Sequence, residues 1–132
     1  MTSCADIWLA ASLIAHDFIP AHFWHQQYAN LCEKYLSQSD IYLATYNEQI
    51  VGFAATTNPN TIAALFVHPS YWHSGVGQAL LSDVLKQKPR LQLTVYAKNR
   101  QAINFYLKQG FNKLTEQICP YTDETEWIMT TA

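Results

Sequence analysis

The sequence predicts an α/β domain whose elements run as two helices, three strands, two alternations of strand with helix, and a closing hairpin. Three observations support this order. Apolar residues recur at helical spacing near the start, β-rich runs surround polar turns in the middle, and glycines and prolines separate strands from helices in the second half. With 132 residues, the chain has the length of one domain, so we expect residues 1–132 to share a single core.

Two helices are expected first. Apolar residues between Ala5 and Ala15 repeat at spacings of three and four, the pattern of an amphipathic helix. The pattern breaks at residues 16–19, and Pro20 suits the first turn of a second helix, whose apolar positions continue to Leu36.

Strands are expected next. Residues 41–46 and 50–57 are β-rich runs on either side of a polar turn, which predicts a hairpin. Residues 61–67 form another apolar run of strand length, and Pro69 stops it.

In the second half, helices and strands alternate. Pro89 breaks the chain, and Gly110 suits the left-handed position that ends a helix. The expected elements are a helix at 78–87, a strand at 91–96, a helix at 99–109, and closing strands at 111–118 and 126–129.

Composition excludes several classes of protein. Apolar residues make up 49% of the chain and charged residues 14%, which is typical of a globular protein and not of a disordered one. The net charge is -2, and the lysines and arginines are scattered, so we expect neither a nucleic-acid nor a membrane partner. The apolar run at 7–19 is too short and too interrupted to be a signal peptide or a membrane span.

The cysteines favour a cytoplasmic protein. Cys4, Cys32 and Cys119 are odd in number and far apart, which predicts neither a disulfide framework nor a zinc site. None lies beside a histidine or a helix-opening turn, so each is interpreted as a small core residue and not as a nucleophile.

A glycine turn follows the strand at 61–67. A polar loop after Val67 ends in Gly75-Val76-Gly77, directly before the helix expected at 78–87. Glycines allow the backbone to turn tightly and approach a ligand, and the first N–H groups of a helix attract anions. The turn therefore predicts a pyrophosphate site, with a plain strand-to-helix turn as the alternative. It lacks the Lys-Ser/Thr of a P-loop and the third glycine of a dinucleotide fingerprint.

Together with a second segment, this turn resembles the GNAT superfamily of N-acetyltransferases. In that family a strand ends in Val-x-Pro, and a loop Gln/Arg-x-x-Gly-x-Gly/Ala and a helix with paired leucines follow. The matching residues are Val67, Pro69, Gly75, Gly77, Leu80 and Leu81. Further on, the family pattern Asn-x-x-Ala-x-x-Phe-Tyr followed by Gly-Phe is matched by Asn99, Ala102, Phe105, Tyr106, Gly110 and Phe111.

The resemblance covers roughly residues 40–131, and one position departs from it. Trp72 stands where the family usually has Gln or Arg. Backbone amides do most of the phosphate binding, so we expect coenzyme binding to survive in weakened form, with His73 as a substitute donor. The preceding segments, residues 15–19 with Phe23 and Trp24, resemble a bacterial subgroup that includes peptidyl-lysine acetyltransferases.

The resemblance implies a GNAT fold, a central twisted sheet that is mixed and mostly antiparallel, flanked by helices. It implies an acyltransferase that uses acetyl-CoA as co-substrate, without a metal. We expect the protein to be a monomer or a homodimer. The implied coenzyme-binding residues are Leu65, Phe66, Val67, Trp72, His73, Ser74, Gly75, Val76, Gly77, Gln78, Asn99, Ala102, Phe105 and Tyr106.

The chemistry of acetyl transfer explains these residue types. An amine attacks the thioester carbonyl, negative charge develops on its oxygen, and the coenzyme leaves as a thiolate. By the resemblance, a backbone N–H near Val67 polarises the carbonyl and the Tyr106 hydroxyl protonates the sulfur. Tyrosine has a pKa of about 10, so it remains a donor at neutral pH. The alternative roles are a core aromatic for Tyr106 and a helix cap for Asn99.

The acceptor side is less specific. By the resemblance, we expect the acceptor to be a primary amine, either a protein lysine or a small molecule. Residues 63 and 64 are alanines where many relatives keep a carboxylate, so deprotonation through water is one possibility, and His16 and His68 are candidate bases by pKa alone. Four residues are candidates for the acceptor cleft, with core packing as the alternative: His16, Phe18, Trp24 and Tyr121.

GNAT domains normally open with a strand, but the sequence predicts no strand before the first helix. Either the sheet has lost an edge strand, a partner chain supplies it, or the start of the protein has been cut away; a bare edge favours dimers.

Two rival functions remain, an acyl-CoA-binding sensor or interaction module without turnover, and a domain that binds another phosphorylated ligand.

Overall fold

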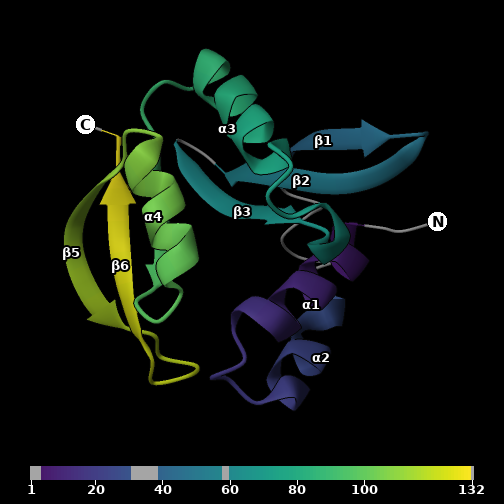
Figure 1. The fold of residues 1–132 in the computed structure, drawn as a ribbon. Coiled ribbons are helices and arrows are strands. Elements are labelled where there is room, and N and C mark those ends of the chain that lie inside the picture. Colours follow the sequence, from purple (N-terminus) through teal and green to yellow (C-terminus); the bar gives the residue numbers. More distant parts are fainter. Residues whose placement is uncertain (1–3, 31–38, 58–59, 132) are drawn as a thin grey trace.

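The computed structural model describes residues 4–30, 39–57 and 60–131, and Figure 1 shows how its elements follow one another. The helices are α1 (Cys4–Ala15), α2 (Ala21–Asn30), α3 (Val76–Gln87) and α4 (Arg100–Lys108), with a 3₁₀ turn, η3 (Pro69–Tyr71). The strands are β1 (Asp40–Tyr46), β2 (Gln49–Thr57), β3 (Thr61–Val67), β4 (Gln92–Tyr96), β5 (Asn112–Ile118) and β6 (Thr125–Thr130).

These six strands form one sheet in the order β1-β2-β3-β4-β6-β5. Neighbours are antiparallel except β3 and β4, which run parallel and pair only at Thr61 and Gln92. The mixed, mostly antiparallel sheet expected from the resemblance is confirmed. Beyond that single pair the two strands diverge, and the sheet opens between them.

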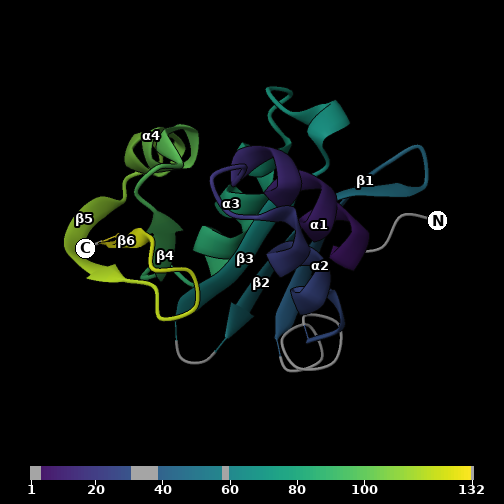
Figure 2. The same ribbon diagram turned by 90° about the horizontal axis from the view of Figure 1, so that it is seen from below.

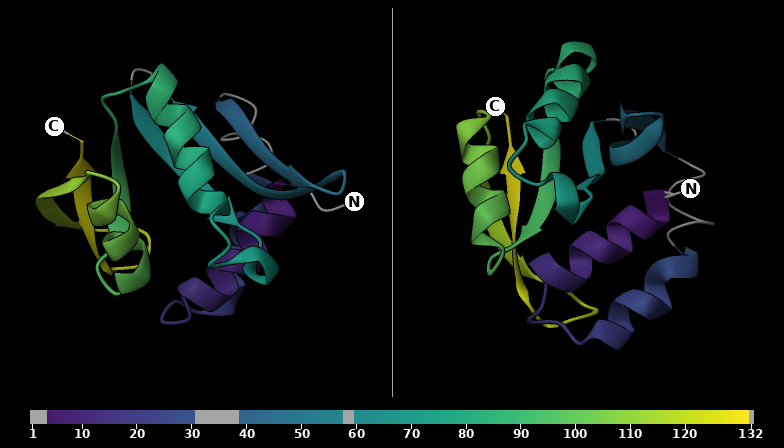
Figure 3. Two further views of the ribbon diagram at one scale, coloured as in Figure 1. Left: turned by 45° about the horizontal axis from the view of Figure 1, so that its top comes forward. Right: turned by 45° about the vertical axis from the view of Figure 1, so that its right-hand side comes forward.

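Helices cover both faces of the sheet (Figures 2 and 3). Side chains of a strand alternate between faces, so Phe53 packs with Trp8 and Trp24 of α1 and α2, whereas Ala54 packs with Leu81 of α3 and Ile103 of α4. The core is therefore two clusters, one on each face, and both border the opening between β3 and β4.

Gly52 of β2 brings α3 close to the sheet. A Cβ on this residue would lie 3.1 Å from the Phe66 carbonyl oxygen and 3.1 Å from Cγ1 of Val76, tighter than ordinary contacts. The missing side chain allows the first turn of α3 to lie against the ends of β2 and β3.

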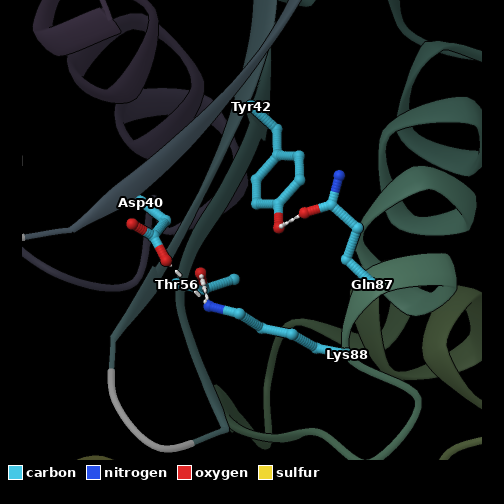
Figure 4. A network of polar contacts seen from close by, with 5 residues as sticks. All are labelled: Asp40, Tyr42, Thr56, Gln87 and Lys88. Atoms are coloured by element: carbon cyan, nitrogen blue, oxygen red, sulfur yellow. Dashed lines mark hydrogen bonds and ion pairs between the residues drawn. The ribbon is translucent and has the colours of Figure 1, made fainter.

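The other end of α3 is tied to the β1–β2 hairpin by polar contacts (Figure 4). Lys88 Nζ donates to Asp40 Oδ2 at 3.0 Å and to Thr56 Oγ1 at 2.8 Å, and the Tyr42 hydroxyl donates to Gln87 Oε1 at 3.1 Å. The helix is therefore anchored at both ends.

Most predicted elements are confirmed within a residue or two, and the differences are local. The second helix is described only to Asn30, and its expected continuation lies outside the described residues. The helix expected at 78–87 begins at Val76, so Gly77 lies in its first turn, and the loop before it contains η3, which the prediction missed. Pro69 occupies the first position of η3, where a missing N–H costs nothing.

In the described residues the first element is α1, which begins at Cys4, and β1 forms one edge of the sheet. Over the same residues, no helix has the length and apolarity needed to cross a membrane.

Candidate active site

The end of β3 presents backbone groups to the opening in the sheet. His68 donates its N–H to the Val51 carbonyl of β2, and strand residues alternate in direction, so the Val67 N–H and C=O point to the opposite edge. The Val67 carbonyl accepts the Trp72 indole N–H at 2.7 Å. The N–H expected to polarise the thioester therefore lies at an edge that β4 does not pair.

The glycine turn forms the start of α3. Gly75 has φ of 87°, a left-handed conformation that favours glycine, and its carbonyl accepts the Ala79 N–H. The turn thereby directs the free N–H groups and positive dipole end of a twelve-residue helix into the cleft beside β3. This geometry suits a pyrophosphate.

A cavity of about 500 Å³ lies between this turn, α4 and the end of α1. All but one of the predicted coenzyme-binding residues line it. The exception is Ser74, whose hydroxyl donates to the Tyr71 carbonyl. Gln101 and Lys108 of α4 also line the cavity, and sequence reasoning missed them because no motif position marks them.

The departure at Trp72 has a structural role. Its indole holds the loop to β3 instead of facing an anion. The neighbouring His73 has φ of 63°, and its Nε2 lies 3.3 Å from Gln101 Nε2, which joins the loop to α4 across the cavity.

Helix α4 positions Asn99 and Tyr106. The Asn99 side chain caps the helix by accepting the Ala102 N–H through Oδ1 at 3.2 Å. Tyr106 lies two turns on, buried against Phe105 and Phe111. Burial raises the pKa of the Tyr106 hydroxyl above its ordinary value, so it is protonated at neutral pH.

His16 is held in one neutral tautomer. Because Asn99 Oδ1 is occupied by the helix, its Nδ2 faces His16 Nε2 at 3.0 Å, and an amide nitrogen only donates. Nε2 therefore accepts, and the proton lies on Nδ1, a buried donor without a partner among the described residues. Burial lowers the pKa of His16 to about 4. Its one basic lone pair is thus engaged, which disfavours a role as general base.

The smaller cavity, about 210 Å³, passes through the opening between β3 and β4 to the face covered by α1 and α2. Trp8 and Trp24 line it, and Trp24 stacks on His16 with ring centroids 5.2 Å apart. Six residues line both cavities: His16, Leu65, Phe66, Asn99, Ala102 and Tyr106. The two cavities therefore meet beside the Tyr106 side chain.

The other acceptor candidates lie outside both cavities. Phe18 packs edge-on against His16 and Tyr96, 5.8 and 5.7 Å between centroids, behind the cavity wall. Tyr121 is 80% exposed on the β5–β6 connection. His68, the other candidate base, caps η3 by accepting the Ser70 N–H. It lines neither cavity.

Tyr96 and Glu126 line the smaller cavity, and the sequence did not single them out. They face each other on β4 and β6, thirty positions apart in the chain, and only the sheet register brings them together. Burial raises the pKa of Tyr96. In the described residues, no group of three or more histidines, cysteines or carboxylates has the arrangement to hold a metal.

A cavity suited to a phosphate-bearing coenzyme on one face of a splayed sheet, met by a second cavity from the other face, is the arrangement expected of a transferase that acts on two substrates. Residues 11–120 match the family model of the acetyltransferase (GNAT) domain. The chain belongs to the GNAT family, and it is an N-acetyltransferase that moves an acetyl group from acetyl-CoA to an amine.

Two curated relatives are similar over most of their length. Peptidyl-lysine N-acetyltransferase YiaC of Escherichia coli is 34% identical over 127 residues, which cover 94% of this chain and 85% of the relative. Peptidyl-lysine N-acetyltransferase YjaB of E. coli is 31% identical over 106 residues, 80% of this chain and 71% of the relative. The solution structure of apo YjaB superposes with a TM-score of 0.83 at 25% identity, covering 97% of this chain and 88% of that one. The comparisons give no support to a binding module without turnover.

Proposed function

We propose that this enzyme acetylates lysine side chains of proteins by direct attack within a ternary complex. The observation that carries this proposal is the meeting of the two cavities at Tyr106, which gives the two substrates separate routes to one point. The names of both curated relatives, peptidyl-lysine N-acetyltransferases, support lysine as the acceptor.

In this mechanism acetyl-CoA lies in the larger cavity. Its phosphates bind at the start of α3, with Lys108 as the cation that lines the same cavity. The thioester reaches the end of β3, where the Val67 N–H donates to the carbonyl oxygen and stabilises the charge that develops there.

The lysine enters through the smaller cavity, and its neutral amine attacks the carbonyl carbon. The C–N bond forms as the C–S bond breaks, and the Tyr106 hydroxyl gives its proton to the departing sulfur. The amine loses a proton to water in the cavity, and water returns a proton to Tyr106, so the hydroxyl is restored. His16 orients Asn99, and through it the first turn of α4, instead of removing that proton.

The test is a comparison of the purified wild type with Tyr106→Phe, using acetyl-CoA and a peptide with one lysine and a blocked amino terminus. Mass spectrometry should find the acetyl group on the lysine Nε. We expect the variant to lose kcat by roughly 10²–10⁴-fold, the usual contribution of a positioned acid, with the Kd for acetyl-CoA unchanged.

Tyr46→Phe is the matched control, because Tyr46 is exposed on β1 and lines neither cavity. It should match the wild type. Equal kcat in Tyr106→Phe and Tyr46→Phe would exclude the acid role. A wild-type enzyme that leaves the blocked peptide unmodified, but acetylates the same peptide with a free α-amine, would exclude lysine as the acceptor.

We also propose that the enzyme works in the cytoplasm, as a monomer or a homodimer. Cys4 and Cys119 are free thiols, which supports a reducing compartment.

A further inference from the structure

The geometry points to Glu126 as the residue that recognises the positive charge of the acceptor amine before transfer. This inference rests on the proposed function, since it concerns the acceptor side of the same site. It assigns a specificity role to a residue that no sequence motif marks.

The first observation is the charge of the two cavity linings. Among the described residues that line the smaller cavity, Glu126 is the only one that carries a full charge at neutral pH, since His16 is neutral and the other side chains are aromatic, aliphatic or uncharged polar. The lining of the larger cavity holds Lys108 and the start of α3, and no carboxylate. The two linings thus differ in sign, and each suits a different substrate.

The second observation is how the carboxylate is held. Tyr96, Glu126 and Gln117 are direct cross-strand partners on β4, β6 and β5, so their side chains share one face of the sheet. Contacts of Tyr96 with His16 and Trp24 identify this as the α1 and α2 face. Gln117 Nε2 donates to Glu126 Oε1 at 3.0 Å, which orients the carboxylate and leaves Oε2 without a partner among the described residues.

The third observation is the aromatic wall opposite. Trp8 and Trp24 pack edge to face, with centroids 5.6 Å apart, and both line the cavity that Glu126 lines. Aromatic faces attract cations. An ionised carboxylate acts only as a hydrogen-bond acceptor, and it forms a strong, charge-assisted hydrogen bond with an ammonium N–H. A primary ammonium at the end of an alkyl chain fits both the aromatic wall and the carboxylate. Its apolar stem would pack against the indoles, and its charged head would face Glu126.

The experiment measures binding and turnover separately. The probes are a blocked peptide with one lysine and the same peptide with norleucine, which keeps the stem and removes the charge. Affinity for the CoA-saturated protein is measured by calorimetry at low and high NaCl. Wild-type protein should prefer lysine about tenfold, the effect of one charged hydrogen bond, and the preference should shrink with salt.

Glu126→Gln should abolish the preference for the lysine peptide and raise its KM about tenfold, with kcat nearly unchanged. Glu126→Asp should retain part of the preference for lysine. Glu116→Gln is the matched control: it removes the same charge from an exposed position of β5, opposite Trp127 and hence on the other face. It should behave as wild type.

Equal affinity of wild type for the two peptides overturns the inference, as does a loss of kcat at constant KM in Glu126→Gln, which would indicate proton transfer instead. A lysine preference that depends on Glu126 in a protein without turnover supports this inference and contradicts the proposed function, so the two failures are distinguishable.

Discussion

At the scale of single residues, the hydrogen bond between His16 and Asn99 joins the end of α1 to the start of α4 across 83 positions of the chain. One Asn99 side chain caps a helix with its oxygen and fixes a histidine tautomer with its nitrogen. The residue that the family pattern marks therefore also determines the protonation state of a residue outside that pattern.

This pair predicts how stability depends on pH. His16 has a pKa of about 4 in the native protein and about 6.5 when unfolded, so the unfolded chain binds more protons in between. The free energy of unfolding should fall as pH drops from 7 to 5, by about 2 kcal/mol from this group. Urea unfolding at both pH values measures it.

His16→Gln should lose that part of the pH dependence, whereas His25→Gln, which changes an exposed histidine of α2, should keep it. An identical pH dependence in wild type and His16→Gln would mean that His16 is not buried as a neutral group.

At the scale of elements, α3 joins the coenzyme turn to the hairpin edge of the sheet. Its first turn lies against Gly52, and its end is held through Lys88 (Figure 4). The two partners of Lys88 differ: Thr56 is 1% exposed, and the Asp40 side chain is 70% exposed. Only the first contact satisfies a buried polar atom.

The contrast predicts unequal effects of two substitutions. Lys88→Met keeps the apolar stem but leaves the Thr56 hydroxyl without its partner, and should lower the free energy of unfolding by about 1–2 kcal/mol. Asp40→Asn removes an exposed ion pair and should cost less than about 0.5 kcal/mol. Chemical denaturation of both variants measures the difference, and equal losses would assign the stabilisation to the ion pair.

At the scale of the whole molecule, two core clusters on opposite faces meet at a sheet that is joined in its centre by one β3–β4 pair. The larger cavity is lined by β3 and α3 on one side of the opening and by α4 on the other. A ligand bound there contacts both halves and stabilises the native state of the entire domain.

Thermal unfolding tests this coupling. Acetyl-CoA at about 100 times its Kd adds roughly 2.7 kcal/mol, which should raise the Tm of a domain of this size by about 10 °C. ADP at the same concentration should give a small rise, because it lacks the pantetheine arm and the acetyl group. Equal rises with the two ligands would indicate a general phosphate site.

Local patterns predicted much of this molecule. Helical and strand periodicity, the glycine turn and the Asn99–Tyr106 spacing depend only on residues close together in the chain. They can therefore be recognised in the sequence before the fold is known. They were sufficient for the element order and for the family, and all but one of the residues predicted to bind the coenzyme line one cavity.

On the acceptor side the sequence marked only His16 and Trp24 of the residues that line the smaller cavity, and tertiary structure decided the rest. Trp8, Tyr96 and Glu126 come from a helix and two strands that are distant in sequence, and they share a cavity because the sheet register and the opening between β3 and β4 bring them together. By itself the sequence predicted the coenzyme only through the resemblance of the glycine turn and the Asn99–Tyr106 segment to the GNAT family, because the turn alone suits any phosphorylated ligand. The lining of the acceptor cavity depends on long-range packing, which no local pattern encodes.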